Sequence, residues 1–397
     1  MKVAIVNTHL RLGGIRQSLL NLLDTLKSQD IEIDLYILSG ELTAIQKQID
    51  GLPVRSIMIL PEMDIYYRTF REQSSIGAKW KKILFAFCSR VVGRETLVKK
   101  IVAYEKLPER EYDVVISYAN GIWSNGSRHF SGGCEFVAQR LKGRKKFAWI
   151  HSNPRNLGFT KEIGERIYSN FDKIVNVSYG CKSIFDEICP NLKDKSIVIY
   201  NLCNSQKVHQ LMNEAVPYKG GFNIVTVARL DNKSKRLDHL AKCCKILKDS
   251  GYVFQWHVVG DGNDMSLLKT LRNSYQLQDE LVIEGRKQNP YPYMKNADLY
   301  VCTSAYEAFP MVLKESFLCG TPAITTPIPP AKEVIRDGKN GFICKGFEPE
   351  DIVEQVKMVM DNKEILPALR EKIGEDSKIY EDNVQPFLML CGVESKL

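Results

Sequence analysis

The cysteines of this chain follow no recognisable pattern. Eleven Cys residues are scattered between Cys88 and Cys391 without a C-x-x-C pair. An odd and unpatterned set excludes a complete disulfide framework and offers no zinc-ligand spacing. No Asp-x-Asp pair follows a predicted strand to hold a divalent metal. We therefore expect reduced, mostly buried cysteines, no metal site and no resident cofactor.

Long apolar segments and nucleotide-loop motifs are also absent. No apolar run reaches the roughly 18 residues that span a bilayer. The chain enters a short strand-like run directly at Met1, without the regions of a signal peptide. Neither G-x-G-x-x-G nor G-x-x-x-x-G-K-S/T occurs, so a dinucleotide-dependent oxidoreductase and a P-loop enzyme lose their main support. We expect a cytoplasmic protein.

Short apolar runs alternate with helical patterns along the whole chain. This alternation is typical of a parallel sheet covered on both faces. The length of 397 residues exceeds what one core supports, so we expect two doubly wound domains. The predicted strands are residues 3–7, 33–38, 113–117, 146–150, 173–177, 197–200, 222–227, 254–259, 281–283, 299–302 and 323–325. The predicted organisation is a first domain over 1–204, a linker over 205–221, a second domain over 222–380 and a tail over 381–397 that packs back on the first domain.

The segment 304–320 carries the strongest chemical signal. Its proline suits the first turn of a helix, and its final glycine suits the position after the helix end. The residues between them are apolar almost all round, which predicts a buried helix with Glu315 as a carboxylate in apolar surroundings. Free N–H groups at Met311 and Val312 favour an anion at the helix start. Together with Glu307, this arrangement predicts a sugar-nucleotide site.

Further candidates lie beyond other predicted strands, where ligands of parallel sheets bind. Arg229 and Lys235 follow the first strand of the second domain, and two cations there suit a departing diphosphate. The alternative is a solvated charged loop. Gly14 and Gly262 follow strands in the first and second domains, where a backbone without side chains allows close approach of a ligand. His151 ends another strand of the first domain.

A basic segment, residues 68–106, holds most of the net charge of +8. Ten Lys and Arg against three Glu leave it with an excess of +7. Within it, Trp80, Ile83, Leu84 and Phe87 recur at helical spacing between cationic residues, as in a basic amphipathic helix. Two interpretations stay open: an ordinary helix with its apolar face on the core, or a surface that contacts anionic lipid or a phosphorylated lipid acceptor at the inner face of the membrane. No nucleic-acid motif accompanies the segment.

Over residues 222–345 the chain resembles the retaining glycosyltransferases of family four, of the bacterial surface-polysaccharide type. The matching elements are Val-Ala-Arg-Leu230 with Lys235, Val-Val-Gly-Asp-Gly262, Glu-Gly285, Asn-Pro-Tyr-Pro-Tyr-Met-Lys-Asn-Ala-Asp298, the pair Glu307 and Glu315, and Lys-Glu-Val-Ile-Arg-Asp-Gly-Lys-Asn-Gly341. The thinner matches of the first domain are Gly13-Gly14, Trp-Ile-His-Ser-Asn153, Asp-Lys-Ile-Val-Asn-Val-Ser178 and Val-Ile-Tyr-Asn201. The resemblance implies the α/β GT-B fold, with two Rossmann-like domains facing across a cleft.

The resemblance also implies roles for single residues. Arg229 and Lys235 would hold the donor diphosphate, and Glu315 would take the ribose hydroxyls. Glu307, with the backbone amides of Phe309 and Met311, would face the transferred sugar. The catalytic set so implied is Arg229, Lys235, Glu307 and His151. The remaining donor-binding positions are Gly14 in the first domain and Gly262, Arg286 and Val312 in the second, with Arg286 near the base.

Three positions depart from the family pattern. Ala308 stands where a glycine commonly follows the first glutamate, and Arg236 stands where a glycine follows the lysine. Ile328-Pro-Pro330 replaces a more glycine-rich loop. None of these changes removes a charged group that the chemistry needs.

The expected activity is transfer of a sugar, with retention and without a metal, from a UDP-sugar to a lipid-linked or growing cell-surface glycan, as in the synthesis of capsule, lipopolysaccharide or exopolysaccharide. The expected partners are this donor, the glycan acceptor and an anionic inner-leaflet membrane surface contacted through residues 68–106, with no nucleic acid. Alternatives are a soluble or protein acceptor, a catalytically silent subunit that binds a sugar nucleotide, and a Rossmann oxidoreductase or epimerase.

Overall fold

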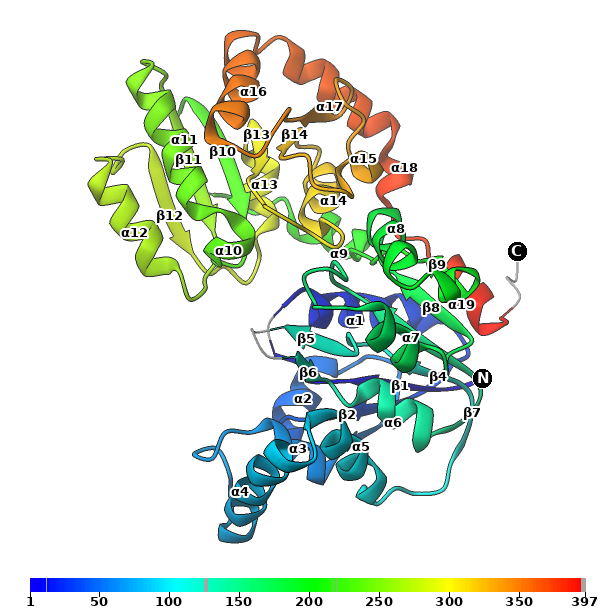
Figure 1. The fold of residues 1–397 in the computed structure, drawn as a ribbon. Helices are drawn as coiled ribbons and strands as arrows, with labels where there is room; N and C mark the ends of the chain where they lie inside the picture. The colour runs from blue at the N-terminus through cyan, green and yellow to red at the C-terminus, as the bar shows by residue number, and fades with distance from the viewer. Residues whose placement is uncertain (12, 125–127, 217, 219, 394–397) are drawn as a thin grey trace. The chain divides into compact units, whose positions relative to one another are not determined.

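The chain divides into two compact units. The computed structural model describes residues 1–11, 13–124, 128–216, 218 and 220–393. The first unit comprises Met1–Leu202 and the segment that begins at Asn383, and the second comprises Cys203–Asp382 (Figure 1). Each unit is an α/β layer structure built on a parallel sheet, so the predicted fold class is confirmed at the level of two Rossmann-like units.

The described part of the first unit is built on a seven-stranded parallel sheet with the order β3-β2-β1-β4-β7-β8-β9. All residues of β1 after Lys2 are buried, as expected for a strand covered on both faces. A two-stranded antiparallel hairpin, β5 with β6, stands apart from this sheet. The strands are β1 (Lys2–Asn7), β2 (Glu32–Ile37), β3 (Val54–Ile59), β4 (Glu111–Ser117), β5 (Ile122–Ser124), β6 (Arg128–Phe130), β7 (Lys142–Ile150), β8 (Lys173–Asn176) and β9 (Ser196–Val198).

Helices and short 3-10 turns connect these strands. They are α1 (Gly14–Thr25), η1 (Leu26–Ser28), α2 (Leu42–Ile49), α3 (Pro61–Tyr67), α4 (Ile76–Val91), α5 (Arg94–Tyr104), α6 (Gly133–Gln139), α7 (Lys161–Tyr168), α8 (Tyr179–Ile188), η2 (Pro190–Lys195) and, after the second unit, α19 (Gln385–Cys391). No helix in the described chain combines the length and the apolar character needed to cross a membrane.

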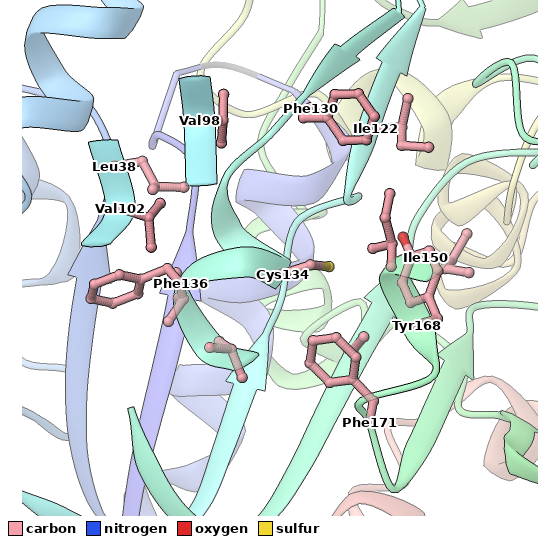
Figure 2. Packing of buried hydrophobic residues seen from close by; sticks show 14 of the residues in the cluster. Leu38, Val98, Val102, Ile122, Phe130, Cys134, Phe136, Ile150, Tyr168 and Phe171 are labelled. Carbon is pink, nitrogen blue, oxygen red and sulfur yellow. The ribbon is translucent and has the colours of Figure 1, made fainter. Parts of the chain in front are cut away.

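One large apolar cluster joins α5, α6 and α7 to the sheet. Figure 2 shows Phe136 of α6 beside Val102 of α5 and Leu38, and Tyr168 of α7 beside Ile150 of β7. All five side chains are almost completely buried. Burial of an aliphatic or aromatic side chain of this size contributes about 1.5–3 kcal/mol, so this cluster is a main source of the first unit's stability.

The C-terminal segment belongs to the first unit. In α19, the Phe387 ring lies 6.0 Å from the Trp149 ring of β7, and both side chains are buried. The expected tail over 381–397 therefore starts two residues later, at Asn383, and its residues 394–397 lie outside the described chain. The expected linker over 205–221 is different in the structure, because α9 (Ser205–Leu211) is a part of the second unit. Pro217 and Lys219 of that linker lie outside the described residues.

The second unit has a parallel sheet with the order β12-β11-β10-β13-β14-β15 in its described residues. Its strands are β10 (Phe222–Val227), β11 (Phe254–Val259), β12 (Leu281–Gly285), β13 (Leu299–Cys302), β14 (Ala323–Thr325) and β15 (Gly341–Ile343). Beside α9, its helices are α10 (Asn232–Lys235), α11 (Leu237–Asp249), α12 (Met265–Ser274), α13 (Tyr291–Asn296), α14 (Met311–Leu318), α15 (Ala331–Val334), α16 (Pro349–Asp361), α17 (Ile365–Glu375) and α18 (Ser377–Tyr380). Helices α11 and α16 pack side by side over its apolar core.

The cysteines agree with the expectation from the sequence. None of these eleven described residues forms a disulfide, ten are buried, and Cys88 is partly exposed. Burial raises the pKa of the Cys134 thiol, which keeps it protonated and unreactive.

A buried carboxylate ties three strands of the first unit together. Asp34 of β2 is fully buried and accepts hydrogen bonds from Arg55 Nε at 3.0 Å, Ser56 Oγ at 2.6 Å, Arg110 Nη1 at 2.8 Å and Tyr112 Oη at 2.9 Å. Burial alone would raise the pKa of Asp34, but these four donors together hold it well below its usual value. The charge of Asp34 is therefore stabilising in the folded state.

We predict that Asp34→Asn lowers the free energy of unfolding by about 1–3 kcal/mol at pH 7, because charged donors lose an ionised acceptor. The folded pKa is lowered, so the stabilisation is complete above the unfolded value of about 4 and is lost as the pH falls below it. The difference between wild type and variant should shrink from pH 7 to pH 3 in urea unfolding. Glu109→Gln, at an exposed neighbouring position, is the control. Equal stability of Asp34→Asn and wild type at pH 7 would contradict the assignment.

Candidate active site

The second unit has a switch point in its strand order between β10 and β13. From β10 the chain continues outward to β11 and β12 on one side, and later to β13, β14 and β15 on the other. The two central strands are parallel, with Val225 paired to Tyr300. Their carboxyl ends therefore lie at the same edge of the sheet, where open α/β sheets bind ligands. The loop and helix α10 after β10 meet the loop 303–310 after β13 at this edge.

Lys235 and Glu307 form an ion pair across these two loops. Their side chains are only 18% and 16% exposed. Glu307 also accepts a hydrogen bond from Ser304 Oγ at 2.8 Å, and the carbonyl of Lys235 accepts one from Thr303 Oγ1 at 2.7 Å. Burial is the largest single influence and lowers the pKa of Lys235, but the charge of Glu307, the nearby Cys302 and the hydrogen bond to Glu307 together leave the pKa raised. Lys235 is thus a permanent cation held in a fixed position.

Arg229 supplies a second cation at the same edge. Its side chain is 65% exposed and lies 3.3 Å from the carboxylate of Asp231. Arg229 acts electrostatically on Lys235, lowering its pKa, so the two cations are near neighbours. The pKa of Tyr306, on the facing loop, is raised mainly by burial. The charges of Asp231, Arg229, Glu307 and Lys235 also act on it. The structure therefore brings together Arg229, Lys235 and Glu307.

The glycines after β11 have a packing role that the sequence did not reveal. A side chain at Gly262 would come within 2.2 Å of the Leu230 carbonyl oxygen, and one at Gly260 within 1.8 Å of the Ala228 carbonyl oxygen. The backbone N–H of Leu230 donates to the carbonyl of Asp261 at 3.0 Å. Gly260 and Gly262 thus allow their loop to lie directly against the backbone that carries Arg229.

Arg236, one of the departures from the family pattern, lies in a tight turn. Its backbone is left-handed, with φ of +50°, and it separates α10 from α11. Glycine adopts this conformation without steric cost, whereas other residues are disfavoured there. The family's glycine after the lysine therefore fits the turn, and this chain holds an arginine in the same turn.

Helix α14 begins after Pro310 and is followed by Gly320 with φ of +75°, as predicted. Its residues from Leu313 to Leu318 are buried, which confirms the buried helix. The expectation of a free N–H at Met311 is wrong, because this group donates to the carbonyl of Phe309 at 2.9 Å. A tight turn before the helix thus occupies the first of the two amides expected to hold an anion.

Glu315 of α14 is a buried carboxylate, as the sequence predicted. It is 8% exposed, and no side chain of the described residues donates a hydrogen bond to it. Burial, followed by the charge of Asp382, raises the pKa of Glu315 to about 7. Glu307 and Glu315 both act on the phenol of Tyr300, whose pKa is raised mainly by burial. Both carboxylates therefore contribute to the electrostatic environment of β13.

Lys314 and Asp382 form a second buried ion pair that the sequence analysis missed. Their atoms Nζ and Oδ1 are 3.4 Å apart, and the side chains are 10% and 8% exposed. Asp382 also accepts the backbone N–H groups of Cys203 at 2.7 Å and Ser205 at 2.9 Å. The sequence did contain a signal for this pair: Lys314 lies beside Glu315 in a largely apolar helix, and a buried cation requires an anionic partner. Asp382, the last residue of the second unit, is thus hydrogen-bonded to the first residue of that unit, Cys203.

Two further predicted site residues, Arg286 and Gly14, each follow a strand of their unit. Arg286 follows β12 at the carboxyl edge of the second sheet and is exposed. In the first unit, Gly14 opens α1 after β1, and no atom lies within 4 Å of where its side chain would be. That glycine leaves open space at the helix start.

His151 directly follows β7 in the first unit and is 8% exposed. Its ring lies 4.7 Å from the ring of Tyr118, and Asn120 Oδ1 accepts its backbone N–H at 2.6 Å. Burial lowers the pKa of His151 to about 3, so the imidazole is neutral at physiological pH. Its ring nitrogens make no hydrogen bond of ordinary geometry within the described chain.

The second unit is similar to a known protein family. Residues 209–379 match the family model described as Glycosyl transferases group 1. An uncharacterised glycosyltransferase of Methanocaldococcus jannaschii is 29% identical over 53% of this chain and 55% of its own length. The chain thus spans about half the length of this relative.

A second relative comes from Campylobacter jejuni. This N-acetylgalactosamine-N,N'-diacetylbacillosaminyl-diphospho-undecaprenol 4-alpha-N-acetylgalactosaminyltransferase is 22% identical over 47% of this chain and 50% of its own length.

Among solved structures, Anabaena HepE in complex with UDP and glucose covers 100% of both chains with a TM-score of 0.66 and 16% identity, which supports the GT-B fold. The second unit is thus similar to the glycosyl transferases group 1 family over residues 209–379, and the likeness to the solved structure shows the GT-B fold.

Proposed function

We propose that this chain is a retaining glycosyltransferase that moves a sugar from a UDP-sugar to a lipid-linked or growing cell-surface glycan. The observation that carries the proposal is the Lys235–Glu307 pair beside Arg229 at the switch point of the second sheet. Two cations next to a carboxylate suit a ligand that presents a diphosphate and hydroxyl groups together. A sugar nucleotide has both.

Each residue has a distinct task in the proposed reaction. Arg229 and Lys235 bind the diphosphate and stabilise its charge as the bond to the sugar breaks. Glu307 keeps Lys235 in place and accepts hydroxyl hydrogen bonds of the sugar. Glu315 accepts those of the ribose. Positive charge that is already fixed near the leaving group needs little reorganisation during the reaction, which is how such sites lower a barrier.

Retention follows from attack on the face that the diphosphate leaves. The acceptor hydroxyl oxygen bonds to the anomeric carbon as the bond from that carbon to the diphosphate oxygen breaks. The departing oxygen takes the proton of the acceptor hydroxyl, so the products are the glycoside and UDP. No protein base is required for this step, and the two cations stabilise the leaving group.

The nucleotide and the acceptor class draw support from the similar proteins. HepE was solved with UDP and glucose, and the name of the Campylobacter jejuni relative contains a diphospho-undecaprenol acceptor. We propose the same classes of donor and acceptor here, without a resident cofactor.

We predict that UDP-sugars raise the unfolding temperature of the protein and that GDP- and ADP-sugars have smaller effects. A donor at 100 times its dissociation constant stabilises the folded state by about 2.7 kcal/mol. Thermal unfolding in the presence of each donor measures the effect. Release of labelled sugar from the stabilising donor then separates an enzyme from a silent binding subunit. Absence of stabilisation by every nucleotide sugar would overturn the proposed function.

We predict that Lys235→Ala and Glu307→Gln each lower kcat about 10²- to 10³-fold, the usual effect of removing one preorganised electrostatic partner. Steady-state assays with the UDP-sugar measure this loss. Lys233→Ala is the matched control, because Lys233 is exposed on the same short helix α10.

Loss of folding is a separate risk for Lys235→Ala, since it leaves the carboxylate of Glu307 unpaired in a largely buried place. The double variant Lys235→Met with Glu307→Gln removes both charges and tests whether the fold survives. A folded single variant that keeps more than about a third of wild-type kcat would refute the assignment.

We predict that the donor KM falls as the pH rises from 6 to 8. The raised pKa of Glu315, about 7, leaves the carboxyl largely neutral below this range and charged above it. Only the charged form accepts hydrogen bonds from both ribose hydroxyls. Glu315→Gln should remove this pH dependence, and Glu315→Ala should raise KM with little change in kcat. An unchanged KM in Glu315→Ala would rule out the ribose role.

A further inference from the structure

Helix α4 carries an apolar stripe that faces away from its own unit. It begins after Ser75, whose side chain accepts the N–H of Ala78 at 3.1 Å, and none of its residues is buried. Six large apolar side chains are between 47% and 76% exposed. They are Ile76, Trp80, Ile83, Leu84, Phe87 and Val91.

The opposite side of α4 provides the contact with the rest of the unit. Ala78, Lys82, Phe85 and Cys88 are partly buried, and Phe85 and Cys88 pack against the core cluster. The helix contacts α3 and α5 on this side, and in Figure 1 the three helices lie together. The apolar stripe is therefore not the face of α4 that packs on the core, in contrast to the first of the two interpretations of the sequence.

The outward apolar stripe has cations along both margins. At 3.6 residues per turn its six side chains fall within roughly 100° of arc. Lys79 and Arg90 follow one margin and Lys81 the other. Lys81 Nζ forms an ion pair with Glu62 of α3 at 2.6 Å, and Lys79 Nζ lies 5.8 Å from the ring centroid of Phe70. Lys82 instead donates to the carbonyl of Tyr66, on the inner side.

We propose that α4 docks through this stripe on the surface of an anionic phospholipid bilayer. A helix that lies in the interface buries its apolar face about 5–10 Å deep, while its cations stay at the level of the headgroups. Cations on both margins complement a continuous negative surface. A second copy of this helix would bring the same positive margins close together, which opposes pairing. The bilayer is therefore the occupant that both the apolar area and the charge fit.

The docking rests on the geometry of α4, and only its purpose rests on the proposed function. Docking would hold the enzyme where a lipid-linked acceptor resides. Donor binding by the second unit is measured without vesicles, so a failure of docking and a failure of the proposed function give different results.

The test is sedimentation of the full chain with vesicles of phosphatidylcholine alone or mixed with phosphatidylglycerol. We expect binding only to the anionic vesicles. The triple variant Lys79→Gln, Lys81→Gln, Arg90→Gln should lose roughly 100-fold in partition coefficient, from the usual contribution of each cation near such a surface. Glutamines at Lys47, Lys142 and Lys193, which are exposed elsewhere in the first unit, are the matched control.

The apolar stripe is tested separately from the charges. Trp80→Ser with Phe87→Ser should weaken binding at least tenfold, because two large side chains no longer leave water. Val253→Ser, at an exposed position of the second unit, should leave binding unchanged. Circular dichroism and thermal unfolding verify that each variant is folded.

Trp80 also reports the depth of insertion. Lipids brominated in the acyl chain should quench wild-type fluorescence more strongly than that of Trp80→Phe, while both proteins sediment with the vesicles. Wild-type protein that stays in the supernatant at low salt overturns the proposal. So does equal binding of the triple variant and its control. A dimer in sedimentation velocity that Trp80→Ser with Phe87→Ser dissociates would replace the bilayer with a second copy.

Discussion

The parallel pairing of β10 with β13 is the constraint on which the rest of the candidate site depends. It brings the segments after these strands to one edge, although Lys235 and Glu307 are far apart in the sequence. The two side chains then share one small, largely buried space and neutralise each other. Without this register, each would be a buried charge without a partner, which costs several kcal/mol. Strand order and charge pairing therefore support each other.

The sequence predicted most strands of the two parallel sheets and missed one edge strand of each, β3 and β15. The predicted strands all occur, because a strand buried on both faces reads as a short continuous apolar run. The edge strand β3 was missed since its side chains are mostly half-exposed and its pattern is diluted by polar residues such as Arg55. In the second sheet, the missed edge strand β15 has only three residues and begins with Gly341. Edge position alone does not explain these misses, because β9 and β12 are also edge strands and were predicted.

The candidate site was predictable in its residues and not in their pairing. Arg229, Lys235 and Glu307 stood out because charges that follow strands collect at one edge. The ion pair of Lys235 with Glu307 joins segments that are distant in the sequence, and so does the ion pair of Lys314 with Asp382. The turn that occupies the N–H of Met311 is set by local backbone geometry that residue types do not reveal. For α4 the amphipathic pattern was evident, but the side that faces the core follows only from tertiary packing.

The path of the chain through the two units has a consequence for synthesis. The second unit is continuous from Cys203 to Asp382, whereas the first needs α19, whose Phe387 packs on Trp149. Domains generally fold as the chain emerges from the ribosome. Here the second unit has its complete sequence before the first unit receives α19. Until α19 is synthesised, Trp149 lacks the contact with Phe387.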